Sequence, residues 1–137
     1  MRNEVCASIA GHDVVLMDSI SLISEANVGG VVISASHGGT ISGAFAASHP
    51  PLFVVFNDAG GGKSGAGRAG LVLLDEAGIA CATVSHESAR IGDAEDTWAN
   101  GVISAVGRAA EAAGIRRGSS VREAVETIAR EAPEKHA

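Results

Sequence analysis

The chain is 137 residues long, which is the size of one globular domain. A net charge of −6 and an aromatic content of three Phe, one Trp and no Tyr argue against nucleic-acid partners, because phosphates attract basic surfaces and bases stack on aromatic rings. No apolar stretch reaches the roughly 18 residues of a membrane-spanning helix, and the polar start lacks a signal-peptide core, so a cytoplasmic location is expected.

The first half of the chain predicts strands that alternate with a helix. Residues 13–23 are typical of a strand that runs into a turn, and residues 5–10 of its hairpin partner at a sheet edge. A glycine-containing turn then precedes a short buried strand over 31–35. Apolar residues at helical spacing predict a helix over 40–48, and Pro50 stops it because proline cannot continue a helix.

The second half continues this alternation. It predicts, in order, a strand over 52–56, a helix over about 63–77 that ends at Gly78, a strand over 80–84, a helix over about 96–113 and a final helix over about 120–132. An apolar stripe at helical spacing carries the prediction of the long helix. Ser120 and Glu123 have the spacing of a capping box at the start of the last one, and the tail over 133–137 is expected to fray.

Strands and helices that alternate with short connections favour right-handed β-α-β units. The predicted fold is therefore a single α/β domain over 1–137, Rossmann-like or flavodoxin-like, with a mainly parallel sheet of four to five strands and helices on both faces. Cys6 and Cys81 form no Cys-x-x-Cys pair, so neither a disulfide nor a cysteine-based zinc site is expected. Cys81 is expected to be a small buried apolar residue.

A polar cluster follows each of three predicted strands. Residues 34–39 read Ser-Ala-Ser-His-Gly-Gly, residues 57–64 read Asn-Asp-Ala-Gly-Gly-Gly-Lys-Ser, and residues 85–93 read Ser-His-Glu-Ser-Ala-Arg-Ile-Gly-Asp. Loops that leave the carboxyl ends of parallel strands meet along one edge of a sheet, where ligands bind in α/β folds. If the three strands are parallel neighbours, the clusters form one site.

The cluster over 57–64 is close to the phosphate-binding pattern G-x-x-x-x-G-K-[ST]. Asn57 stands where the first glycine belongs, and the apolar-acidic segment over 71–76 is typical of a helix end rather than a magnesium-binding strand. A nucleotide hydrolase is therefore not favoured. Backbone N–H groups of this loop, at a helix N-terminus, still favour an anion or a developing oxyanion. The alternative is that the glycines only permit a tight turn and close packing.

Two Ser-His pairs stand at matching strand ends, over 36–37 and 85–86, and a general base is expected among them. A lone His after a strand is often a surface or capping residue, but two pairs in equivalent places favour chemistry. The glycines over 38–39 add backbone amides that can stabilise an anion. Either serine could be a nucleophile activated by a neighbouring base, and which histidine moves the proton stays open.

Charged residues in the loops are candidates for binding the substrate. Arg90 is expected to anchor the substrate, because a guanidinium binds a carboxylate or phosphate group through two hydrogen bonds. Two alternatives would also explain these residues: a surface ion pair between Arg90 and Asp93, or a helix cap formed by Asp93. Lys63 and Asp58 flank the glycine turn. A lysine at the start of a helix is unfavourable beside the positive end of the helix dipole, and a bound anion would offset this cost. The alternative is that Lys63 is only a solvated surface charge. The His and Asp residues lack local metal-ligand spacing, so no metal and no cofactor is predicted.

The stretch from Val31 to Val121 resembles a family of small bacterial α/β proteins to which no activity is assigned. The resemblance rests on Ser-His-Gly-Gly at 36–39, Asn-Asp-Ala-Gly at 57–60 with Gly-Lys following, and Ser-His-Glu-Ser-Ala-Arg-Ile-Gly-Asp at 85–93. It covers about two-thirds of the chain and implies no function. Residues 63–70 and 36–39 are also similar to the Ser/Lys repeats of ring-opening cyclic amide hydrolases. Those proteins have three such units and this chain has one, so this second similarity suggests a reaction type only.

The sequence therefore predicts a small-molecule enzyme, a hydrolase or lyase, that acts on a compact anionic or amide-bearing metabolite at the carboxyl edge of the sheet. The expected catalytic residues are Ser36, His37, Asp58, Lys63, Ser85 and His86, and the expected binding residues are Gly38, Gly39, Asn57, Gly60, Gly61, Gly62, Ser64, Arg90 and Asp93. The alternatives are a non-catalytic module that binds phosphate, a nucleotide or an organic acid, and a structural subunit. A domain this small often completes its pocket at a subunit interface, so a homo-oligomer is expected.

Overall fold

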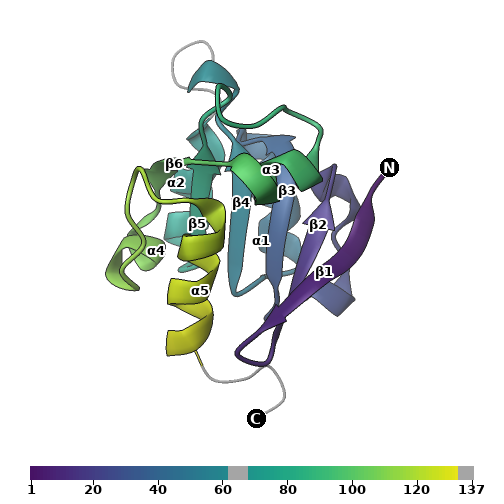
Figure 1. Cartoon of the computed structure of the whole chain (residues 1–137), viewed down its shortest axis with the longest axis vertical. Coiled ribbons are helices and arrows are strands. Elements are labelled where there is room, and N and C mark those ends of the chain that lie inside the picture. The colour runs from purple at the N-terminus through teal and green to yellow at the C-terminus, as the bar shows by residue number, and fades with distance from the viewer. Residues whose placement is uncertain (62–67, 133–137) are drawn as a thin grey trace.

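A six-stranded mixed β-sheet forms the centre of the molecule, and helices cover both of its faces (Figure 1). The structure, a computed structural model, describes residues 1–61 and 68–132. The strands are β1 (Asn3–Ile9), β2 (His12–Met17), β3 (Val31–His37), β4 (Phe53–Asn57), β5 (Ala80–Val84) and β6 (Ile103–Val106). The α-helices are α1 (Thr40–Ser48), α2 (Ala69–Glu76), α3 (Ala94–Asn100), α4 (Arg108–Ala112) and α5 (Val121–Glu131), and the 3₁₀ turns are η1 (Ile20–Leu22), η2 (Glu25–Asn27) and η3 (Ala59–Gly61). None of the described helices has the length and apolar character needed to cross a membrane.

The six strands lie side by side in chain order, from β1 at one edge to β6 at the other. The strands β2, β3, β4 and β5 are parallel, whereas β1 and β6 pair antiparallel with their neighbours. The three strands that precede the polar clusters are thus parallel neighbours, as predicted. The described strands show no reversal of order of the kind that Rossmann-like and flavodoxin-like sheets have, so this part of the fold prediction was wrong.

The prediction of four to five mainly parallel strands is corrected to six strands in a mixed sheet. Ala10 and Gly11, which join β1 to β2, both have positive φ, of 51° and 83°. A two-residue turn of this kind allows only antiparallel pairing of the strands it joins. The hairpin expected at this edge of the sheet is therefore present.

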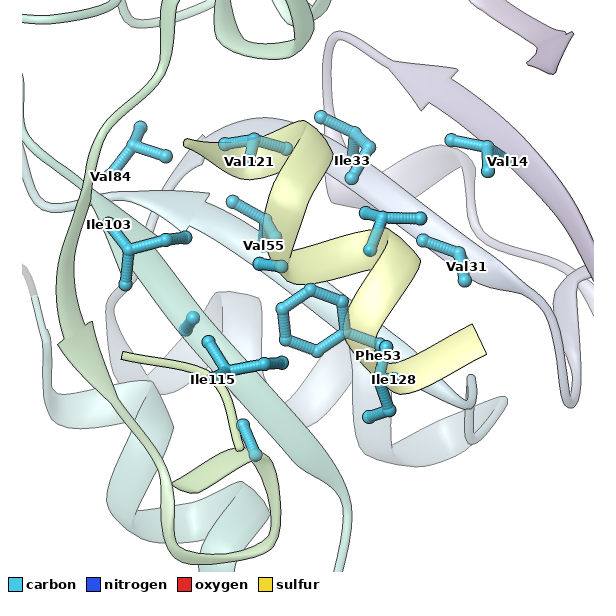
Figure 2. Close-up of a cluster of buried hydrophobic side chains, with 14 of the residues drawn as sticks. Val14, Val31, Ile33, Phe53, Val55, Val84, Ile103, Ile115, Val121 and Ile128 are labelled. Atoms are coloured by element: carbon cyan, nitrogen blue, oxygen red, sulfur yellow. The ribbon is translucent and has the colours of Figure 1, made fainter. Parts of the chain in front are cut away.

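Side chains alternate between the two faces of the sheet and build one core on each face. Phe53 and Val55 of β4 pack with residues of α3, α4 and α5, as Figure 2 shows for the face that α5 covers. Val54 and Phe56, which alternate with them, belong to the second core together with Leu74 of α2. In Figure 1, α3 and α5 lie in front of the sheet, and α1 and α2 lie behind it.

Two glycines let α1 and α2 pack closely against each other. A Cβ atom on Gly43 of α1 would lie 2.9 Å from the Cα of Gly70 in α2. A Cβ on Gly70 would lie only 2.4 Å from the carbonyl oxygen of Gly39. The Gly70 N–H donates to the Gly38 carbonyl oxygen over 2.9 Å, so α2 is fixed against the loop that leaves β3.

The single helix predicted over 96–113 was wrong, because this segment contains α3, β6 and α4. The break occurs at Gly101, where a Cβ would lie 2.5 Å from the Thr97 carbonyl oxygen and 2.8 Å from the Val121 side chain. The chain then becomes an edge strand that pairs with β5. Strand pairing, which is a tertiary interaction, overrides the helical spacing of the apolar residues.

The remaining boundaries agree with the sequence. Gly78 has a φ of 74° directly after α2, and Ser120 and Glu123 form the predicted capping box of α5. Cys81 is buried in β5, as expected. The predicted tail over 133–137 and the first part of the helix predicted over 63–77 lie outside the described residues.

Candidate functional site

The chain leaves β4 and β5 toward opposite faces of the sheet. The helix α2, which follows β4, contributes to one core, whereas the loop after β5 leads to α3 in the other core. Connections that diverge from neighbouring parallel strands leave the carboxyl edge between them accessible, and ligands bind at such points in α/β proteins. Asp58 directly follows β4 and His86 lies two residues after β5, so both residues stand at this divergence.

The loop over 85–93 crosses the carboxyl edge of the sheet from β5 to β2. The Gly92 N–H donates to the Ala35 carbonyl oxygen of β3 over 2.9 Å. The Ala94 N–H, at the start of α3, donates to the Asp18 carboxylate after β2, also over 2.9 Å. These two bonds attach this part of the chain to β3 and to the residue that follows β2.

Asn57, at the end of β4, holds three segments of this edge together. Its fully buried side chain donates to the Ala89 carbonyl oxygen over 2.9 Å and accepts the Ala59 N–H over 2.8 Å. Its own carbonyl oxygen accepts the Gly38 N–H. Both polar ends of the side chain are used and no part of it is exposed, so Asn57 positions the loops in this structure. Its binding role stays a prediction.

Asp58 and His86 form a carboxylate–imidazole pair at the divergence of β4 and β5. The Nδ1 atom of the His86 ring lies 3.6 Å from Oδ1 of Asp58. The Asp58 side chain is 13% exposed, whereas that of His86 is 51% exposed, so the ring has one side toward the carboxylate and the other toward solvent. A Cβ on Gly60 would lie 3.4 Å from Cε1 of His86, which places the ring against the glycine loop.

Two backbone N–H groups hold the Asp58 carboxylate in place. Its Oδ1 atom accepts the Gly60 N–H over 2.8 Å and the His86 N–H over 3.1 Å, and the nearby Ser104 hydroxyl of β6 favours its charged form. Partial burial acts to raise the pKa of Asp58, but these hydrogen bonds and the nearby His86 ring outweigh it and hold the pKa below its usual range. The carboxylate is therefore ionised at neutral pH and can orient an imidazole beside it.

The amides of the glycine loop are largely engaged within the loop itself. The Gly60 N–H bonds to the Asp58 carboxylate, and the Gly61 N–H donates to the Asp58 carbonyl oxygen over 2.7 Å. In this structure the two amides hold Asp58, and the binding role expected for them stays a prediction. The predicted Gly62, Lys63 and Ser64 lie outside the described residues.

The first Ser-His pair lies at the same edge, one strand away. His37 pairs in register with Asn57, and its ring packs on Gly39, where a Cβ would lie 2.4 Å from Cε1 of the ring. The Ser36 hydroxyl accepts the Ile20 N–H over 2.9 Å. Among the described residues, His37 has no carboxylate partner, so the geometry favours His86 over His37 as the base.

The second Ser-His pair does not form a serine–histidine dyad. The Ser85 hydroxyl accepts the Glu87 N–H over 3.1 Å and thereby closes the turn after β5. Within the described ranges, neither Ser85 nor Ser36 is hydrogen-bonded to the ring of the histidine that follows it. Ser36 and His37 are adjacent residues of β3 and point in opposite directions, which explains why this pair does not meet.

Asp93 and Arg90 lie at the start of α3. Asp93 is the N-cap of this helix, because its carboxylate accepts the Asp96 N–H over 3.0 Å. The Arg90 N–H donates to the Asp96 carboxylate over 2.7 Å, and the Arg90 side chain is exposed. The capping alternative for Asp93 is therefore the one that the structure supports, and the described residues contain no Arg90–Asp93 ion pair.

Ser104 is the contact that sequence reasoning missed. It lies in β6, which the sequence predicted as helix, and its hydroxyl is also 2.9 Å from that of the buried Thr83. The described residues contain no cluster of three His, Cys, Asp or Glu side chains that could hold a metal ion. Comparison of the chain with protein-family models, curated proteins and solved structures finds no match, so the functional argument rests on the site itself.

Proposed function

We propose that the chain is a small-molecule enzyme, a hydrolase or lyase, that acts on a compact anionic or amide-bearing metabolite at the carboxyl edge of the sheet. In this proposal, the Nε2 atom of His86 accepts a proton from water or from the substrate, and Asp58 orients the ring through Nδ1. The observation that carries the proposal is the Asp58–His86 pair, with an ionised, hydrogen-bonded carboxylate behind a half-exposed imidazole.

The geometry of this pair suits general acid–base catalysis. A carboxylate that bonds Nδ1 of an imidazole fixes the tautomer and leaves the other ring nitrogen available as a base. The separation of 3.6 Å is longer than a hydrogen bond, and catalytic contacts of this kind tighten when the reacting molecule is in place. His86 also lines an open hollow of about 310 Å³ together with Glu87, Ser88, Ala89, Arg90 and Asp96, which leaves room for a small molecule beside the ring.

Turnover of a substrate panel tests the proposal. Short amides, cyclic amides, small esters and small hydroxy acids cover hydrolysis and elimination, and His86→Gln and Asp58→Asn are compared with His49→Gln. His49 follows α1 at the opposite edge of the sheet and serves as the control. We expect His86→Gln to reduce kcat by roughly 10²–10⁴-fold, the usual contribution of one general base, and His49→Gln to leave it unchanged. Wild-type turnover in His86→Gln would end the proposal, and saturable binding without turnover would select the binding module instead.

We also propose that copies of the chain associate, as expected from its size. Ile41 and Phe45 of α1 and Val72 of α2 are large apolar side chains that remain exposed, and the whole of α1 carries no charged residue in a chain of net charge −6. An uncharged apolar helix face avoids the electrostatic repulsion between two acidic copies. Light scattering that gives 13.7 kDa would remove this proposal.

A further inference from the structure

One cation near the Asp58–His86 pair has no ion-pair partner among the described residues. This cation is Arg68, which stands immediately before α2 and makes no side-chain cap with that helix. Its Nη2 atom lies 4.0 Å from the position that a Cβ on Gly61 would occupy. The corresponding position on Gly60 is 3.4 Å from the His86 ring, so the guanidinium and the imidazole lie against successive residues of one loop.

Arg90, the anchor expected from the sequence, has a different electrostatic environment. It lines one hollow with Glu87 and Asp96 and a second hollow with Asp93 and Glu95. Carboxylates outnumber the single guanidinium in these hollows, so an anion placed there would meet net negative charge. Arg90 therefore does not make this surface attractive to the anionic group of a substrate, whereas the hollow beside His86 still has room for its uncharged reacting end.

The carboxylate of the Asp58–His86 pair is already satisfied by other donors. Asp58 accepts hydrogen bonds from the Gly60 and His86 N–H groups, and its side chain is mostly buried. Arg68 is exposed and forms no salt bridge with it. No hydrogen bond or ion pair with another described residue engages the Arg68 guanidinium, and a guanidinium is suited to two-point binding of a carboxylate or phosphate group.

We propose that Arg68 binds the anionic group of the substrate, an oxyanion of the carboxylate or phosphate type, beside Gly61 and within reach of His86. This inference rests on the proposed function and gives it a substrate class: the reacting molecule carries an oxyanion at one end and presents its reacting bond to the imidazole. Gly60 and Gly61 themselves place no side chain between the two functional groups.

The test is an NMR titration of the full chain with two probes, inorganic phosphate and acetate, at constant ionic strength set with chloride. The amide signal of Gly61 and the ring signals of His86 report binding. Arg68→Gln and Arg68→Lys are compared with Arg90→Gln and with Arg117→Gln, a control at an exposed arginine in the connection between α4 and α5. We expect saturable chemical-shift changes in the wild type. Arg68→Gln should raise the Kd of the probe about tenfold, which is the loss expected for one charge-assisted contact. The Kd should change little in the two control variants, Arg90→Gln and Arg117→Gln. The lysine variant keeps the charge but not the two-point geometry, so it should bind with intermediate affinity.

The outcomes separate this inference from the proposed function. Phosphate or acetate binding that is lost in Arg90→Gln and retained in Arg68→Gln would overturn the role of Arg68, as would the absence of saturable shifts with both probes. His86→Gln should still bind the tighter of the two probes, because Arg68 carries that contact. If His86→Gln keeps full turnover while Arg68→Gln loses anion binding, the catalytic proposal fails and the anion site stands. The relative affinity for phosphate and acetate shows which oxyanion the site accepts.

Discussion

Replacement of Asp58 by Asn tests whether its charge organises the carboxyl edge. The carboxylate accepts two hydrogen bonds from backbone N–H groups and is 13% exposed, so loss of the charge weakens contacts that are mostly shielded from water. We expect Asp58→Asn to lower the free energy of unfolding at about pH 7 by about 1–3 kcal/mol, the range for hydrogen bonds to a charged group. The matched control is Asp13→Asn, because Asp13 is an exposed aspartate on β2.

The pH dependence of this difference gives the sharper result. The folded state lowers the pKa of Asp58, so its contribution to stability is fully present above the unfolded pKa of about 3.9 and is lost as pH falls through the folded pKa. Urea unfolding followed by Trp98 fluorescence should therefore show wild type and Asp58→Asn converging as the pH falls below about 4. The charge would not be the stabilising feature if the difference in unfolding free energy between wild type and Asp58→Asn had the same size at neutral pH and below about pH 4. The absence of any difference at neutral pH would equally refute a stabilising role of the charge.

Three further predictions concern the fold. Gly70→Ala should lower the free energy of unfolding, measured in urea, by about 1–3 kcal/mol, because the new Cβ would lie 2.4 Å from the Gly39 carbonyl oxygen. A variant as stable as wild type would contradict the close packing of α1 and α2. Ser120→Ala should cost about 1 kcal/mol by loss of the α5 cap, whereas an unchanged urea midpoint would contradict that cap. Burial raises the pKa of the Cys81 thiol to about 12, so iodoacetamide should label only the exposed Cys6 in the native protein. Both thiols should be labelled in denaturant, and labelling of Cys81 in the native protein would contradict its burial.

The sequence identified the elements whose signals are local. The buried strands β3, β4 and β5 are short apolar runs bounded by turn residues, and each ends in a polar cluster. The α5 capping box is a contact between Ser120 and Glu123, three residues apart, so it can be read directly from the sequence. Parallel pairing of the three strands follows from the helices between them, and this was enough to place Asp58 and His86 at one edge.

The features that the sequence did not predict depend on tertiary contacts. The edge strand β6 exists because it pairs with β5, while its apolar residues have helical spacing. Ser104 lies in that strand, so its effect on the Asp58 carboxylate could not be anticipated once the segment was predicted as helix. A sequence shows which groups can donate or accept hydrogen bonds, but it does not show that the Gly60 and Gly61 amides are engaged by Asp58.

The histidine that has a carboxylate partner could not be chosen from the sequence for the same reason. His37 and His86 both follow a serine at a strand end, and the two patterns are equivalent by local criteria. The difference arises because Asp58 follows β4 and bonds to the backbone of His86 across the divergence of the two connections. Arg68 likewise has no distinguishing pattern in the sequence and stands out only through its place beside Gly61.

The central claim, that Asp58 orients the His86 ring, is tested most directly by two-bond ¹H–¹⁵N NMR of the histidine side chains in the neutral form. We predict that His86 carries its proton on Nδ1, which faces the Asp58 carboxylate at 3.6 Å, and that Nε2 is unprotonated. Asp58→Asn should remove this tautomer preference, while the signals of His37 stay unchanged. A wild-type His86 with its proton on Nε2, or a tautomer ratio that Asp58→Asn does not alter, would contradict the account.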